Sequence, residues 1–135
     1  MPFIIAAPGL KSRGGVGRAT VELLDLYPTL ADPAGLKAPE NLQGASLRSL
    51  LDDPAAAWTR PAFTRTARGK KNGEFIFGRS VRTDRWRYTE WKEGEAEAEL
   101  YDHEIDPGEP TNLIRDPAWE AERAKLAPLL KQARQ

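Results

Sequence analysis

Four basic side chains between positions 65 and 71 offer the clearest chemistry in this sequence: Arg65, Arg68, Lys70 and Lys71. Guanidinium and ammonium groups hold sulfate and carboxylate groups through charge-assisted hydrogen bonds. The cluster therefore predicts a binding site for an anionic substrate. The simpler interpretation is a solvated loop between two strands, and the residues alone leave both interpretations open.

Charge is divided unevenly along the second half of the chain. Ten basic and three acidic residues lie between Arg60 and Lys92, whereas eleven acidic residues and one arginine lie between Glu93 and Glu122. We expect the two segments to neutralise each other in part through surface ion pairs. A calcium site in the acidic segment is a weaker hypothesis, because the spacing of the carboxylates does not match an EF-hand loop.

The sequence has one histidine, His103, and no cysteine. A multi-histidine metal site, a thiolate metal site and a cysteine nucleophile are therefore excluded for this chain, and a serine triad has little support. We assign no catalytic and no metal-binding residue, and expect His103 to be structural at a strand end. Arg82 and Arg87 are expected to pair with a nearby carboxylate across a hairpin: Asp84, Asp102 or Asp106.

The overall composition is that of a soluble globular protein, with 40% hydrophobic and 30% charged residues. Twenty basic residues balance twenty acidic ones, so the net charge gives no case for nucleic acid or an anionic membrane as a partner. The apolar runs are far shorter than the ~20 residues of a membrane-spanning helix, and we see no signal peptide. The sequence does not indicate a compartment.

The elements that must position these side chains begin with a short apolar run at residues 3–7, which predicts a strand covered on both faces. Leucines at helical spacing then predict a helix that is capped by Thr20. Pro28 should bend this helix or separate its first turn from the rest. A second, short helix is expected at residues 47–51, capped by Ser46.

From residue 59 the pattern changes to strands followed by one helix. Strands are expected at 62–64, 75–77, 80–83 and 86–91, the last two forming a hairpin around Asp84, and again at Leu100. Asp116 and Pro117 are typical of a helix start. The buried side of that helix should carry Trp119, Leu126, Leu129 and Leu130. The predicted fold class is α+β, a small antiparallel sheet with a C-terminal helix packed on it.

Three stretches resemble sulfatases of the iduronate-2-sulfatase type, in the alkaline phosphatase-like superfamily: residues 2–9, residues 21–47 with their Asp-Leu-Tyr-Pro-Thr core, and residues 78–109. Together they follow the order of the family over nearly the whole chain. The resemblance implies that residues 1–58 are the tail end of the sulfatase α/β core, contributing a strand and a helix. Residues 59–135 would then be its C-terminal antiparallel-sheet subdomain.

The resemblance also implies what this chain lacks. The family uses a formylglycine made within a Cys/Ser-x-Pro-x-Arg motif and a calcium ion held by aspartates and an asparagine, and none of these motifs is present. We therefore expect a C-terminal fragment that is inactive alone, with the missing N-terminal sulfatase portion as partner and a sulfated carbohydrate as ligand. Arg68, Lys70 and Lys71 lie nearest the family's substrate loop. The alternative is a non-enzymatic α+β module that binds an anionic ligand or a protein partner.

Overall fold

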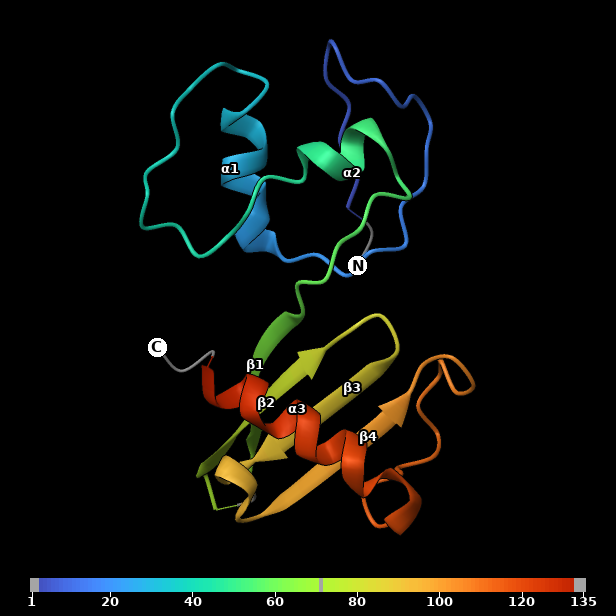
Figure 1. The fold of residues 1–135 in the computed structure, drawn as a ribbon. Helices are drawn as coiled ribbons and strands as arrows, with labels where there is room; N and C mark the ends of the chain where they lie inside the picture. The colour runs from blue at the N-terminus through green and yellow to red at the C-terminus, as the bar shows by residue number, and fades with distance from the viewer. Residues whose placement is uncertain (1–2, 71, 133–135) are drawn as a thin grey trace. The chain divides into compact units, whose positions relative to one another are not determined.

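The computed structural model describes residues 3–70 and 72–132 and divides into two compact units, residues 1–60 and residues 61–135. Figure 1 shows helices and irregular segments in the first unit, and a sheet with one long helix in the second. Among the described residues, no helix is long and apolar enough to cross a membrane.

The first unit is organised around a short helix, α1 (Leu26–Ala31), which follows a 3-10 turn, η1 (Leu23–Asp25). Pro28 lies in the first turn of α1, where a backbone N–H has no partner within the helix. The proline is therefore accommodated in the first turn of α1, and the 3-10 turn gives way to the helix before it, at Leu26. The predicted cap at Thr20 is wrong, because Glu22 and Asp25 form a reciprocal capping box.

Two polar side chains of the Asp-Leu-Tyr-Pro-Thr motif bind the returning chain to α1. Asp25 and Thr29 are almost fully buried. An Asp25 carboxylate oxygen accepts the Ala45 N–H at 2.8 Å, and the Thr29 hydroxyl accepts the Leu47 N–H at 2.9 Å. Gly44, which directly precedes Ala45, passes so close to η1 that an added Cβ would overlap the backbone of Leu24. The motif therefore holds the segment at residues 44–47 against η1 and α1.

The other elements of the first unit follow the sequence in part. Helix α2 (Arg48–Asp52) ends before Pro54, so the predicted short helix is confirmed within one residue at each end. The predicted cap at Ser46 is wrong by one position, because Leu47 is the N-cap residue, although the Ser46 hydroxyl accepts the Arg48 N–H at 3.2 Å. Residues 3–7 do not form the predicted strand. The described residues offer them no neighbouring strand, and an extended segment without ladder partners is not a strand.

The second unit contains a four-stranded antiparallel sheet in the order β1-β2-β3-β4. Its strands are β1 (Ala62–Gly69), β2 (Phe75–Arg82), β3 (Trp86–Trp91) and β4 (Glu97–Asp102). The predicted hairpin around Asp84 is confirmed, and the expected strands at 75–77 and 80–83 are one continuous strand. The predicted loop at 65–71 is wrong for its first five residues, which extend β1 because they pair with β2.

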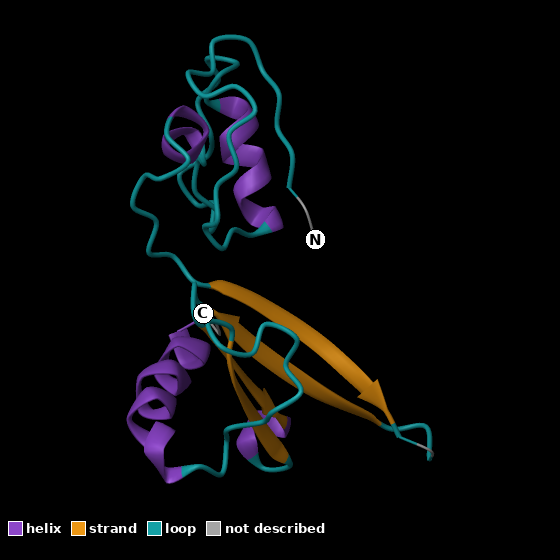
Figure 2. Cartoon of the chain, turned by 90° about the vertical axis from the view of Figure 1, so that its right-hand side faces the viewer, coloured by secondary structure: helices purple, strands orange, loops and turns teal. Residues whose placement is uncertain are grey.

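Helix α3 (Glu120–Gln132) covers one face of this sheet, and the pairing register explains how (Figure 2). Phe63, Val81, Tyr88 and Leu100 form one row across the four strands. The last three of these residues form the buried core with Leu126 and Leu130 of the helix, and Phe63 packs against that core. Asp116 caps the preceding turn η3 (Pro117–Trp119) by accepting the Ala118 N–H at 2.9 Å, which confirms the predicted helix start. The α+β fold is as the sequence predicts.

The opposite face of the sheet, called the second face here, carries polar and aromatic side chains. By the period-two rule it consists mainly of Arg68, Ser80, Arg82, Arg87, Thr89, Trp91, Glu99 and Tyr101. Thr89, Trp91 and Glu99 are nevertheless buried, at 3%, 5% and 9% exposure. The side chains of the second face therefore cover one another, although α3 packs on the other side.

Ion pairs between the basic and acidic segments support the second unit, as the charge distribution predicts. The completely buried carboxylate of Asp102 accepts two hydrogen bonds from Arg85, at 2.9 and 2.6 Å, where β4 ends. Arg85 also pairs with the exposed Glu104 at 2.9 Å. The hydrogen bonds from Arg85 hold the pKa of Asp102 below its usual value, so the ionised form is stabilised by folding.

We predict that Asp102→Asn lowers the free energy of unfolding by about 1–3 kcal/mol, because it removes the charged acceptor of a buried pair. A lowered carboxylate pKa contributes stability that is complete above the unfolded pKa, near 3.9, and is lost as the pH falls through the folded pKa. Wild type should therefore lose more stability than the variant below about pH 4. Urea unfolding at several pH values measures both effects.

Glu104→Gln is the matched control, because it removes the exposed partner of the same arginine. Its cost should stay below about 1 kcal/mol. Equal destabilisation by the two variants would contradict the assignment of Asp102 as the supporting carboxylate.

Candidate functional site

The structure separates the four cations that the sequence groups together. Arg65 lies in β1 with an exposed side chain, and its guanidinium stands 4.9 Å from the centre of the Phe77 ring. Lys70 follows β1 and pairs with Glu74 at 3.2 Å. Lys71 lies outside the described residues. Arg65 and Lys70 thus remain at the surface near the turn between β1 and β2.

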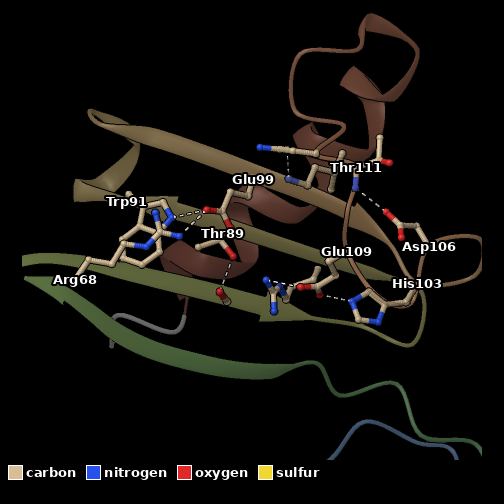
Figure 3. Close-up of polar contacts among 12 residues, drawn as sticks. Arg68, Thr89, Trp91, Glu99, His103, Asp106, Glu109 and Thr111 are labelled. Carbon is tan, nitrogen blue, oxygen red and sulfur yellow. Dashed lines mark hydrogen bonds and ion pairs between the residues drawn. The ribbon is translucent and has the colours of Figure 1, made fainter.

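Arg68 is on the other side of the sheet from Arg65, on the second face. Its guanidinium lies 3.6 Å from the centre of the Trp91 ring and donates to Glu99 at 3.0 Å. The Trp91 indole N–H donates to the same Glu99 oxygen at 3.0 Å, and Figure 3 shows the three side chains converging. The cation–π contact and the ion pair engage Arg68 within the fold.

An open hollow of about 760 Å³ lies along the β1–β2 hairpin, and it brings Arg65 and Lys70 together with residues that the sequence did not single out. We call it the hairpin hollow, and its principal side chains are Arg65, Lys70, Phe75, Phe77, Arg79 and Lys92. Phe75 and Phe77 are 66% and 51% exposed. Arg65 and Arg79 lie directly opposite each other on β1 and β2. Neither forms an ion pair with a carboxylate among the described residues. Both can therefore bind an anion in the hollow.

Sequence reasoning missed the contribution of β2 to this hollow. Phe75, Phe77 and Arg79 alternate with Ile76 and Gly78, so a strict period-two reading of residues 75–82 would have placed them on one face. Reading this stretch as two short strands concealed the alternation. Lys92 also lines the hollow. It directly follows β3, and no local sequence pattern indicates that it lies near Arg65 and Lys70.

A second polar cluster ties the segment after β4 to the sheet. Glu109 accepts from Arg87 at 2.6 Å and contacts the Nε2 atom of His103 at 2.5 Å (Figure 3). His103 directly follows β4, which confirms its predicted place at a strand end. The predicted pairing of Arg87 with Asp84, Asp102 or Asp106 is wrong. Asp102 pairs with Arg85 instead, and the turn at 106–109 places Glu109 next to Arg87.

The described residues contain no group of three or more histidine, cysteine, aspartate or glutamate side chains placed to hold a metal ion. The sequence also supplies no cysteine for conversion to formylglycine and no Ser-x-Pro-x-Arg motif. The residues of this chain therefore do not fit the calcium and formylglycine centre of the sulfatases.

The Trp91 ring, on which Arg68 stacks, lies so close to the backbone of Gly78 that position 78 has no room for a side chain. A Cβ at Gly78 would lie 2.7 Å from two carbons of the Trp91 ring, whereas a Cβ at Gly69, also in a strand, would meet only Phe75 at 3.8 Å. We predict that Gly78→Ala lowers the free energy of unfolding by about 1–3 kcal/mol through overpacking. Gly69→Ala should change it by less than about 1 kcal/mol. Thermal unfolding of the pair measures the difference, and equal values would contradict the close packing.

Comparison with proteins of known sequence places the chain among sulfatases. It is 37% identical over 121 residues to a Delta 4,5-hexuronate-2-O-sulfatase of Bacteroides thetaiotaomicron, covering 88% of this chain and 25% of that protein. It is 32% identical over 122 residues to arylsulfatase K of Mus musculus, covering 86% of this chain and 22% of that protein. The chain thus spans about a quarter or less of the length of these relatives.

Solved structures have the same fold over most of the chain. A 2-O GAG sulfatase matches 81% of this chain and 23% of its own, with a TM-score of 0.65 and 34% identity. A protein in complex with its substrate, D-glucosamine-2-N,6-O-disulfate, matches 81% of this chain and 23% of its own, with a TM-score of 0.68 and 26% identity. Residues 1–135 match the family described as N-sulphoglucosamine sulphohydrolase, C-terminal. The chain belongs to this family of sulfatase C-terminal domains.

Proposed function

We propose that this chain is the C-terminal portion of a sulfatase of the iduronate-2-sulfatase type, which hydrolyses the sulfate ester of a sulfated sugar. The family match over residues 1–135 is the observation that carries the proposal. The relatives named for sulfated sugars or aryl sulfates are about four times as long as this chain. The formylglycine and calcium would belong to the N-terminal portion, and the chain would be inactive alone.

The first unit has the surface expected of a part that packs against that N-terminal portion. Leu23, Leu24, Tyr27 and Leu30 on and before α1 are between 52% and 62% exposed. Exposed apolar side chains gathered on one short element mark an interaction surface. We infer that residues 1–58 complete the α/β core of the enzyme, with α1 as a helix of that core.

The second unit would supply one wall of the substrate pocket through the hairpin hollow. Arg65 and Lys70 would bind a sulfate or uronate carboxylate, and Phe77 offers an apolar face to a sugar ring. Lys71, which follows Lys70 in the sequence, is a further candidate for this binding. Arg68 belongs to the same basic cluster, but its contacts with Trp91 and Glu99 favour a supporting role. The hollow is mixed in charge, since Glu74, Glu90 and Glu93 also line it. This mixture favours a polar, partly anionic ligand over a polyanion.

We predict that the chain binds D-glucosamine-2-N,6-O-disulfate through this hollow. Arg65→Gln should weaken binding about tenfold, because a hydrogen bond to a charged group contributes about 1.5–3 kcal/mol. Arg115→Gln is the matched control, since Arg115 is an exposed arginine outside the hollow. Isothermal titration calorimetry measures the three affinities, and equal weakening by both variants would contradict a site in the hollow.

Two further observations separate the proposed enzyme portion from a stand-alone binding module. The coding DNA upstream of Met1 should contain an in-frame Cys/Ser-x-Pro-x-Arg motif, and a stop codon in its place would favour the module. The isolated chain should release no sulfate from the same sugar with calcium added. Release above background would contradict the assignment of catalysis to another portion of the protein.

A further inference from the structure

Two arginines oppose each other directly across the end of the β2–β3 hairpin. Arg82 is the last residue of β2, Arg87 is its cross-strand partner in β3, and both side chains lie on the second face. Like charges directly opposite each other destabilise a sheet. Such a pair is retained in a fold when something else compensates its charge.

The described residues compensate only one of the two arginines by direct contact. Arg87 donates to Glu109 at 2.6 Å and stacks 5.3 Å from the centre of the Tyr101 ring. Arg82 forms no ion pair among the described residues. Its Nη1 atom and the Nε atom of Arg87 are buried without a hydrogen-bond partner there. Buried donors of charged groups are costly when they are unmatched, so these two N–H groups need an acceptor.

The carboxylates nearest Arg82 act on it through space and form no ion pair with it among the described residues. Burial lowers the pKa of Arg82, while Glu109 and Asp84 oppose this effect through space and Arg87 adds to it. Glu109 is already bonded to both Arg87 and His103. Glu109 is therefore committed to other partners, and neither it nor Asp84 supplies the acceptor that the buried Nη1 atom of Arg82 lacks among the described residues.

We propose that Arg82 and Arg87 together form an oxoanion site, which takes a sulfate or carboxylate group between their guanidinium groups. The planar fork of each guanidinium matches two oxygens of such a group. The Arg87 side chain is 36% exposed although its Nε atom is buried, so the site borders solvent through the outer part of this side chain. The group comes from a sulfated or carboxylated sugar, or from a free anion, and both sources share the same chemistry.

This site is separate from the hairpin hollow and does not rest on the proposed function. Residues of β2 alternate between the two faces, so Arg79 points to the hollow and Arg82 to the second face. A chain whose hollow binds nothing could still bind an oxoanion at Arg82, and the reverse also holds. The two sites therefore fail independently in an experiment that follows each of them.

The test is a sulfate titration of the 135-residue chain, followed by the arginine Nε–Hε resonances in NMR spectra at constant ionic strength. We expect saturable shifts of the Arg82 and Arg87 resonances. Arg82→Gln should weaken the site reported by Arg87 at least about tenfold. Arg115→Gln, which changes an exposed arginine outside the strands and the hollow, should leave it unchanged. Acetate in place of sulfate shows whether the site prefers a carboxylate.

Thermal unfolding supplies a readout that a purely structural arginine would not give. Sulfate stabilises proteins in general, so the Arg115→Gln variant, which changes an exposed arginine outside the hollow, reports this general effect. Wild type and Arg115→Gln should gain the same additional melting temperature in sulfate over chloride, and Arg82→Gln should gain less. If Arg82→Gln does not fold, Arg82→Lys keeps the charge without the fork and should also bind more weakly. No saturable shift in wild type, or the same affinity in Arg82→Gln, would overturn the proposal.

Discussion

A four-stranded sheet has two faces, and this chain supplies one long helix to cover them. Helix α3 closes the first face with an ordinary apolar layer built on Val81, Leu100 and Leu130. The second face is closed by its own side chains, because arginines lie over aromatic rings and end on carboxylates. Much of the remaining structure follows from this arrangement. The basic residues of β1 to β3 form ion pairs with carboxylates of β4 and the segment after it. The turn after β4 folds back so that Glu109 pairs with Arg87.

In the first unit, too, buried polar side chains form specific hydrogen bonds that hold the fold together. Asp25 and Thr29 are buried, yet each satisfies backbone N–H groups of the segment that returns from α1. The Asp-Leu-Tyr-Pro-Thr motif therefore has a structural explanation that requires no ligand. Because those two residues face inward, the leucines and the tyrosine of the same helix remain outside, where another part of a sulfatase would pack. Recognition of the family rests on residues of this structural kind.

Sequence reasoning succeeded where local chemistry decides the outcome. The cap at Asp116, the turn at Asp84 and the strand at 86–91 depend on neighbours in the chain, and the structure confirms all three. It failed where a distant partner decides. Residues 3–7 have the composition of a buried strand but no strand beside them, and β1 continues past Arg65 because β2 pairs with it along its whole length.

The candidate site could be predicted only in outline for the same reason. The cluster of cations at 65–71 is visible in the sequence, but its division between two faces depends on strand geometry. Arg65 joins Phe77 and Arg79, while Arg68 joins Trp91 and Glu99. Glu99 lies 31 positions from Arg68, so no local pattern reveals that partnership.

The most direct measurement of this account is a double-mutant cycle on Arg68 and Glu99. Urea unfolding would be compared for wild type, Arg68→Gln, Glu99→Gln and the double variant. If this ion pair closes the second face, the two changes should couple by about 1 kcal/mol or more, because the partners share one buried contact. A coupling free energy near zero, with both single variants close to wild type, would show that the face is held by other contacts and would contradict the account.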